Sequence, residues 1–143
     1  MDLHITDKAA IPYNNRERGL DPHNFSPYAD YWFNLIILPY LLPAKHGILL
    51  TTQEEVSIPM FFSGLIGMRS TWARLGLLTP PTVADPGFEG TLTLELYNAS
   101  PNSIWIKPQD SIWHILLVST PFEPKYNGSY QHQVGLTLPK QLP

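Results

Sequence analysis

The segment from residue 69 to residue 77 contains two arginines and two hydroxyl side chains next to a glycine. Arg69 and Arg74 carry planar guanidinium groups, each able to donate two parallel hydrogen bonds to a phosphate. Between them, Ser70 and Thr71 add hydroxyls and, at the start of a short helix, free backbone N–H groups that favour an anion. The segment therefore predicts a phosphate site. A solvated surface turn is the alternative, because the motif is short.

Two carboxylates follow this segment. Asp85 precedes Pro86-Gly87, where an aspartate either begins a turn through its own side chain or binds a polar group of a ligand. Glu95 lies within an apolar stretch, on the polar side of a strand with a period of two. Such a glutamate is either simply solvated or acts as a general acid and base in a closed pocket.

The histidines do not have the spacing of a zinc site. The zinc-dependent nucleobase deaminases use an H-x-E motif and a C-x-x-C motif to bind the metal that activates water. No histidine here is followed two residues later by glutamate, and there is no cysteine. We therefore expect no protein-bound metal, and any deamination must proceed without zinc. The five histidines are His4, His23, His46, His114 and His132.

Composition narrows the class of protein. The formal net charge of −3 argues against binding to a nucleic acid polymer, whereas a free nucleotide needs only a few converging cations, which nine Lys and Arg residues can supply. The N-terminus lacks the basic and apolar regions of a secretory signal. The longest apolar run, 35–42, contains Pro39 and is too short to span a bilayer. Absence of cysteine fits a reducing compartment, so we expect a cytoplasmic protein without a membrane partner.

The elements that must position these side chains are mostly short strands. Fifteen prolines and nine glycines argue against long helices. At 143 residues we expect one domain, with an irregular N-terminal arm over 1–30 that has room for one short strand, and a mobile C-terminal tail over 120–143. One short helix is predicted over 70–75, capped by Ser70 or Thr71. The predicted strands are 47–52, 54–59, 91–98, 103–108 and 112–118, with a strand pair or a strand and turn over 31–42. This pattern favours an antiparallel sandwich or jelly roll.

Taken together, the motifs resemble a known family. Residues 67–98 are similar to the pattern G-x-R-S-S-x-A-R-x-G, I-D-P/A-G-F/W-x-G and L-E-x-Y-N of the dCTP deaminase branch of the dUTPase superfamily. Residues 126–139 are similar to the C-terminal segment Y-x-G-K-Y-Q-G-Q-x-G-x-T of that family. Residues 49–59 also resemble the strand that precedes its arginine motif. The likeness covers about two thirds of the chain.

The resemblance implies a distorted antiparallel β-barrel or jelly roll of the dUTPase-like type, assembled as a homotrimer with active sites between subunits. It implies hydrolytic deamination of dCTP to dUTP, with Mg²⁺ bound through the substrate triphosphate and dTTP as a candidate inhibitor. A second step from dUTP to dUMP stays open. The implied catalytic residues are Glu95 as proton carrier, Ser70 at the water and Asp85 on the deoxyribose 3′-hydroxyl. The implied phosphate residues are Arg69, Ser70, Thr71 and Arg74. The implied sugar and base residues are Asp85, Tyr126, Tyr130 and Gln133.

Three alternatives to the deaminase remain. A plain dUTPase usually has an apolar residue at the position of Glu95 and a Gly-rich tail resembling Arg-Gly-Ser, so the presence of Glu95 favours the deaminase or a bifunctional enzyme. Ser129 stands where the family has a tail lysine, with Lys125 as a substitute from a different angle. The N-terminal third of the chain is also short compared with that of the family and lacks a clear P-x-S-x-D-L segment. These departures leave open a module on the same scaffold that binds a nucleotide or a protein without catalysis, or a structural subunit without a ligand.

Overall fold

The computed structural model describes residues 1–12, 21–24, 32–121 and 125–142. Its described part is mostly strand, with one short helix, α1, and all strand pairs are antiparallel. The elements are β1 (Asp2–Pro12), β2 (Phe33–Ile37), β3 (Tyr40–Leu42), β4 (Gly47–Ser57), β5 (Phe62–Met68), α1 (Ser70–Arg74), β6 (Leu77–Leu78), β7 (Thr82–Ala84), β8 (Glu89–Asn98), β9 (Ile104–Ile106) and β10 (Ser111–Ser119). This confirms the predicted fold class of an antiparallel β structure with one short helix.

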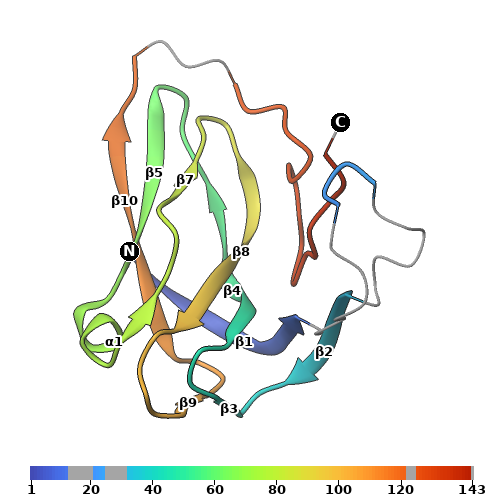
Figure 1. The fold of residues 1–143 in the computed structure, drawn as a ribbon. Coiled ribbons are helices and arrows are strands. Elements are labelled where there is room, and N and C mark those ends of the chain that lie inside the picture. The colour runs from blue at the N-terminus through green and yellow to red at the C-terminus, as the bar shows by residue number, and fades with distance from the viewer. Residues whose placement is uncertain (13–20, 25–31, 122–124, 143) are drawn as a thin grey trace.

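One large sheet forms most of the molecule. Its strand order is β6-β8-β4-β1-β10-β5-β7, with β2 paired to β1, while β3 and β9 form a separate pair. Figure 1 shows the sheet curling, so that β10, β5 and β7 lie on one side of the molecule, and the C-terminal segment lies beside β8 on the other. The curl encloses the hydrophobic core and leaves β8 facing the C-terminal segment.

Strand β8 shows the predicted alternation. Leu94 and Leu96 are each 1% exposed, whereas Glu95 and Tyr97 face outward. Because successive strand residues point to opposite faces, burial of the leucines against the core directs Glu95 to the other side of the sheet. Burial of Leu94 and Leu96 therefore both anchors β8 and turns the Glu95 carboxylate away from the core.

The N-terminal residues correct one expectation. Residues 2–12 form β1, an 11-residue strand between β4 and β10, where an irregular arm with one short strand at most was expected. Leu3 and Ile5 are fully buried and alternate with His4, a period-two pattern that indicates a strand. The rest of that arm, at 13–20 and 25–30, lies outside the described residues.

The segment 31–42, predicted as a strand pair or as a strand and turn, is followed by the structure from residue 32 onward. The described part contains two strands, β2 and β3, joined across a cis peptide bond between Leu38 and Pro39. The predicted strands 47–52 and 54–59 are one strand, β4, whose register with β8 shifts between Thr51 and Glu55. A β-bulge of this kind bends a strand without ending it. This local bend is why the residues around position 54 were predicted to form a turn between two strands.

The C-terminal segment follows β8 without forming regular structure. The described residues 125–142 contain neither helix nor strand. They contact β8 through backbone hydrogen bonds, such as the one from the Thr91 N–H to the Gln133 carbonyl at 2.9 Å. The mobility predicted for this tail stays a prediction. No helix within the described ranges is long and apolar enough to cross a membrane.

Candidate functional site

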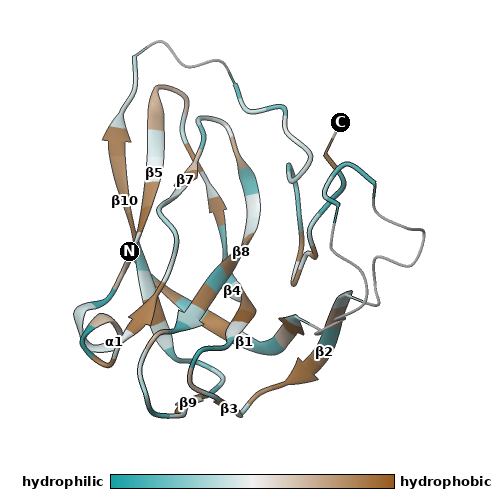
Figure 2. Ribbon diagram, viewed as in Figure 1, coloured by the Kyte–Doolittle hydropathy of each residue, from teal (hydrophilic) through white to brown (hydrophobic). Residues whose placement is uncertain are grey.

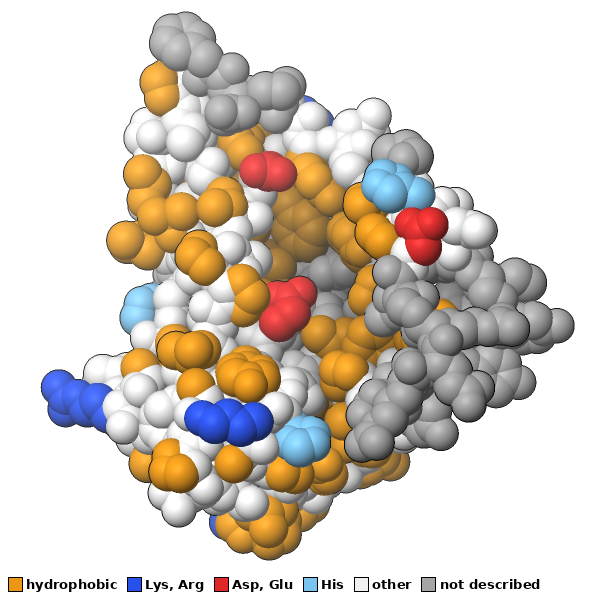
Figure 3. Space-filling model, in the orientation of Figure 1, with side chains coloured by type: hydrophobic (Ala, Val, Ile, Leu, Met, Phe, Trp, Pro, Cys, Tyr) orange, Lys and Arg blue, Asp and Glu red, His pale blue; other side chains and the backbone are white. Residues whose placement is uncertain are grey.

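A cavity of about 340 Å³ lies where β7, β8 and the C-terminal segment meet. Its lining includes both carboxylates singled out from the sequence, Asp85 and Glu95. It also includes three residues of the tail, Tyr126, Tyr130 and Gln133. Figure 3 shows a hollow on this face of the molecule, with hydrophobic side chains on its floor and acidic side chains beside it. All five predicted acid, sugar and base residues therefore meet in one place.

Asp85 begins a tight turn at the rim of this cavity. The Phe88 N–H donates to the Asp85 carbonyl at 3.0 Å, and Gly87 has a φ of 77°. Proline at the second position and a left-handed glycine at the third are the signature of a type II turn. The Asp85 side chain is exposed, and no described residue donates a hydrogen bond to its carboxylate. The turn thus holds the backbone of Asp85 and leaves its oxygens available to a ligand.

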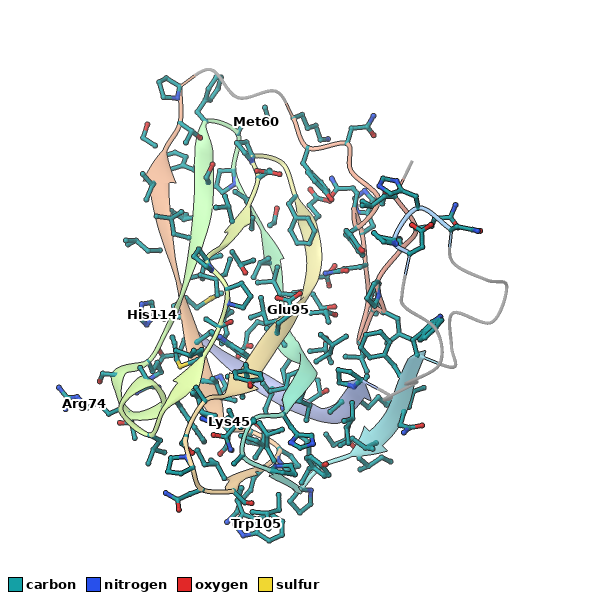
Figure 4. The ribbon with its side chains drawn as sticks, viewed as in Figure 1. Lys45, Met60, Arg74, Glu95, Trp105 and His114 are labelled. Atoms are coloured by element: carbon teal, nitrogen blue, oxygen red, sulfur yellow. The ribbon has the colours of Figure 1, made fainter. Side chains whose placement is uncertain are left out.

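Glu95 enters the cavity from the middle of β8. It pairs with Leu49 of β4 in register, and its carbonyl accepts a 2.6 Å hydrogen bond from the Thr79 hydroxyl. Figure 4 shows its side chain near the centre of the molecule. Within the described ranges its carboxylate has no hydrogen-bond or ionic partner. A carboxylate held by a rigid strand and free of partners can accept a proton from water and return it to a leaving group.

The tail residues are already in place along the cavity. The ring of Tyr126 packs edge-on against Phe88, with 5.6 Å between ring centroids. The Gln133 amide donates to the Thr91 carbonyl at 2.6 Å, while its own Oε1 is buried and has no partner in the described part. Buried acceptors are normally satisfied, so this oxygen is available to a donor on a ligand.

No lysine or arginine of the described residues lines the cavity. Its charged groups within the described ranges are Asp85 and Glu95 alone. Two carboxylates repel a triphosphate, so the described lining by itself offers the phosphates of a nucleotide no cationic partner.

The predicted phosphate residues lie on a different surface. Arg69 donates from Nη1 to the Asp2 carboxylate and to the Ser111 hydroxyl, both at 2.9 Å. Arg74 is exposed in the last turn of α1, and Figure 4 shows it pointing away from the molecule. The cavity lining includes none of the four residues expected on the phosphates, which are Arg69, Ser70, Thr71 and Arg74.

The helix itself is close to its predicted range, but its predicted cap is wrong. Arg69, with φ −70° and ψ 142°, occupies the N-cap position, and no side-chain hydrogen bond caps the helix. Ser70 is already the first helical residue. A hydroxyl caps a helix from the extended position before the first turn, so Ser70 and Thr71 lie too late in the chain to do so.

Other residues at the site were not predicted from the sequence. The Gln131 side chain joins the tail to the segment after Asp85, and the Thr93 hydroxyl accepts from the Thr137 N–H at 3.0 Å. Gln131 lies two residues before Gln133 in the tail motif, which is the signal that could have found it. Among the described residues, no group of three or more His, Cys, Asp or Glu side chains is arranged to bind a metal ion.

The sequence of the chain is similar to that of known proteins over most of its length. A family model described as dCTP deaminase-like matches residues 1–120. A dCTP deaminase of Pyrobaculum calidifontis is 45% identical over 145 residues, covering 89% of this chain and 82% of the relative. A probable deoxyuridine 5′-triphosphate nucleotidohydrolase of Sulfolobus islandicus rod-shaped virus 1 is 42% identical over 103 residues, covering 71% of this chain and 64% of the relative.

Solved structures support the fold. The 2′-deoxycytidine 5′-triphosphate deaminase from Agrobacterium tumefaciens superposes with a TM-score of 0.63 at 18% identity, covering 82% of this chain and 38% of that one. The EIAV dUTPase superposes with a TM-score of 0.54 at 16% identity, covering 85% of this chain and 96% of that one. These likenesses confirm the dUTPase-like type of the fold.

Proposed function

Because this chain belongs to the dCTP deaminase-like family, we propose that it catalyses the zinc-independent hydrolytic deamination of dCTP to dUTP in pyrimidine deoxynucleotide metabolism. The observation that carries the proposal is the unpartnered carboxylate of Glu95, which lines the same cavity as Asp85 and the tail residues. A merely solvated glutamate has no reason to share one cavity with a second carboxylate and two tyrosines, as Glu95 does.

The geometry supports a role for each of these residues. A deoxycytidine in the cavity places its sugar at the exposed carboxylate of Asp85, which accepts a hydrogen bond from the 3′-hydroxyl. Glu95 takes a proton from a water that adds to the ring carbon bearing the amino group. It then delivers that proton to the amino nitrogen, which leaves as ammonia when the carbon–nitrogen bond breaks. The second proton of the water moves to the ring nitrogen N3 as the C4 carbonyl forms, so that dCTP and water give dUTP and ammonia. A water held between Glu95 and the ring carbon reacts more readily, because the reacting atoms are oriented before the reaction begins.

The tail completes the enclosure. Tyr126 and Tyr130 line the cavity from the C-terminal segment, and Gln133 offers its unpartnered Oε1 to a donor on the nucleotide. A segment that closes over the substrate excludes bulk water and strengthens each electrostatic contact inside. We therefore propose that these three residues bind the sugar and the base.

A second copy of the chain supplies the phosphate-binding cations. Leu116 of β10, Leu65 of β5 and Val83 of β7 pair across neighbouring strands, and they are 61%, 42% and 52% exposed. Figure 2 shows β10 as mostly hydrophobic, and Figure 3 shows hydrophobic side chains over β10, β5 and β7. An exposed apolar row of this kind marks an interaction surface.

This apolar row ends at the cavity, since Val83 also belongs to the cavity lining. A neighbour docked on the row would lie close enough to bring its own α1 to the open side of the site. We propose a homotrimer in which Arg69, Ser70, Thr71 and Arg74 of one subunit bind the phosphates of a nucleotide in the cavity of the next. Ser70 then lies near the attacking water.

Magnesium fits this arrangement as a companion of the nucleotide. The cavity holds carboxylate oxygens and no described cation, and Mg²⁺ prefers oxygen ligands, chiefly those of phosphates. When bound, the ion offsets phosphate charge. The chain contributes Asp85 and Glu95 to the sugar and the base, and the ion is held through the triphosphate.

Release of pyrophosphate from dUTP is the second candidate function. It is favoured by the 42% identity to the viral protein named as a probable deoxyuridine 5′-triphosphate nucleotidohydrolase. In this reaction Asp85 would activate a water for attack on the α-phosphate. Both reactions use the same cavity, and so a bifunctional enzyme is consistent with one site.

The test is a product assay. The purified protein is incubated with Mg²⁺ and either dCTP or dUTP, with and without dTTP, and the nucleotides are separated. We expect dUTP or dUMP from dCTP, and inhibition by dTTP. Unchanged dCTP with dUMP formed from dUTP would assign the protein to the dUTPase branch. Nucleotide binding without any product would indicate a module that has lost catalysis, and a melting temperature unaffected by any nucleotide would indicate a structural subunit. A cytoplasmic location stays a prediction.

A further inference from the structure

The side chain of Gln131 bridges the tail and the segment that follows Asp85. Its Nε2 donates to the Gly87 carbonyl at 2.7 Å, and its Oε1 accepts from the Glu89 N–H at 2.9 Å. Both ends of one amide are therefore bonded to backbone groups two residues apart. A side chain that satisfies a donor and an acceptor of the same backbone segment fixes that segment in both position and direction.

Backbone hydrogen bonds continue this contact on both sides of Gln131. The Tyr126 N–H donates to the Pro86 carbonyl at 2.7 Å, and the His132 N–H donates to the Glu89 carbonyl at 2.8 Å. Residues 126–133 thus follow residues 86–91. Of these tail contacts, the bridge by Gln131 is made through a side chain and can be removed by substitution.

Gly90 permits this close approach. Its φ is 142°, and a Cβ built on it would lie 2.6 Å from the carbonyl oxygen of Gln133. A distance that short is a steric clash with backbone, so a larger residue at position 90 would push the tail away. The absence of a side chain at Gly90 thus lets the backbone of the tail contact the backbone of β8 directly.

The turn that carries Asp85 is held from two sides. On one side, the carbonyl of Ile58, the residue after β4, accepts from the Gly87 N–H at 2.9 Å. From the tail, the Pro86 and Gly87 carbonyls accept from Tyr126 and Gln131. The carboxylate of Asp85 has no described partner of its own, and its location depends on the turn.

We propose that Gln131 is a positioning residue for the nucleotide site, which holds the Asp85 turn and so couples docking of the tail to recognition of the deoxyribose 3′-hydroxyl. This inference rests on the proposed function for its last step alone. The anchoring step concerns the protein without nucleotide.

The first experiment tests anchoring in the absence of nucleotide. The variants are Gln131→Ala, Gln131→Glu and, as a matched control in the same tail, Val134→Ala, since Val134 is 81% exposed. Limited proteolysis of the tail is followed by mass spectrometry. We expect cleavage of Gln131→Ala within 125–142 to be roughly tenfold faster than that of the wild type, because two hydrogen bonds are lost. Gln131→Glu should be intermediate, because its carboxylate accepts from Glu89 but cannot donate to Gly87, and Val134→Ala should match the wild type.

The second experiment tests positioning. The ratio of kcat/KM for dCTP to that for 2′,3′-dideoxycytidine triphosphate measures recognition of the 3′-hydroxyl. We expect Gln131→Ala to lower this ratio roughly fivefold, because a misplaced Asp85 no longer distinguishes the two nucleotides. A protein in which Gln131 only stabilises the tail would lose kcat/KM for both nucleotides equally.

The outcomes separate this inference from the proposed function. Unchanged cleavage of Gln131→Ala, or equal losses for the two nucleotides, would overturn the inference while leaving the deaminase intact. If the wild type forms no product, the proposed function fails, and the same ratio taken from dissociation constants by calorimetry decides whether Gln131 positions Asp85. Absence of binding by either nucleotide would overturn the positioning step, with anchoring still decided by proteolysis.

Discussion

Glu95 and Arg74 belong to one chain but open onto different surfaces. Glu95 lines the cavity between β8 and the tail, whereas Arg74 extends from α1 into solvent and is not part of the lining. A nucleotide that contacts both groups must lie between two copies of the chain. If Glu95 and Arg74 both contact the nucleotide, the proposed reaction requires an oligomer.

Subunit complementation tests this relationship directly. Glu95→Gln and Arg74→Ala should each be inactive, but a mixture of the two, unfolded and refolded together, should regain activity. In random trimers about a quarter of the sites combine an intact Glu95 from one subunit with an intact Arg74 from its neighbour. The measurement is dCTP turnover before and after mixing. A chain that carries both changes is the control, and a mixture that stays inactive would argue against a shared site.

Substitution of Glu95 tests its role as proton carrier. Glu95→Gln keeps the shape of the side chain but cannot shuttle a proton, so deamination should fall by about 10² to 10⁴-fold. Nucleotide binding measured by calorimetry should change little. Glu55→Gln makes the same chemical change at an exposed position on β4, outside the cavity lining, and should keep full activity. Equal turnover by the two variants would exclude Glu95 as the acid and base.

A charge in the exposed apolar row should dissociate the assembly. Leu116→Lys places an ammonium at the pair of Leu116 and Leu65, where desolvating a charge is unfavourable. We expect a folded monomer without deaminase activity, measured by sedimentation and circular dichroism. Leu35→Lys, at a position that is 71% exposed on β2, is the matched control and should remain a trimer. A trimeric Leu116→Lys would place the interface elsewhere.

Removal of divalent cations separates a substrate-bound ion from a protein-bound one. EDTA should abolish turnover of dCTP, and Mg²⁺ should restore it, because the ion accompanies the triphosphate. The melting temperature of the nucleotide-free protein should be insensitive to EDTA, since only a ligand of the folded chain stabilises it. A lower melting temperature with EDTA would instead reveal a metal held by the protein.

Truncation of Leu94 tests how far the core supports the strand that carries Glu95. Leu94 is 1% exposed, and Leu94→Ala should lower the free energy of unfolding by about 2–5 kcal/mol through lost burial and a residual cavity. Urea denaturation at a fixed protein concentration measures the change. Leu35→Ala on β2 should cost less than about 1 kcal/mol, because its side chain is largely exposed. Similar losses for the two variants would mean that β8 is not held by its buried face.

Much of the local structure was readable from the sequence. The alternation of leucines around Glu95 predicted β8, and the short segment after Arg69 predicted α1 close to its observed range. Asp85-Pro86-Gly87 predicted a turn, which the structure contains. These features depend on neighbouring residues, whose spacing alone decides backbone conformation and the face that is buried.

The tertiary structure decided which of these pieces meet. It inserts β1 between β4 and β10 and brings the tail against β8, so that Tyr126, Tyr130 and Gln133 share a cavity with two distant carboxylates. It also directs α1 to another surface, although the motif containing Arg74 lies close to Asp85 in sequence. Pairing between strands far apart in the chain depends on the whole sheet and its core, and no local spacing of residues carries that information.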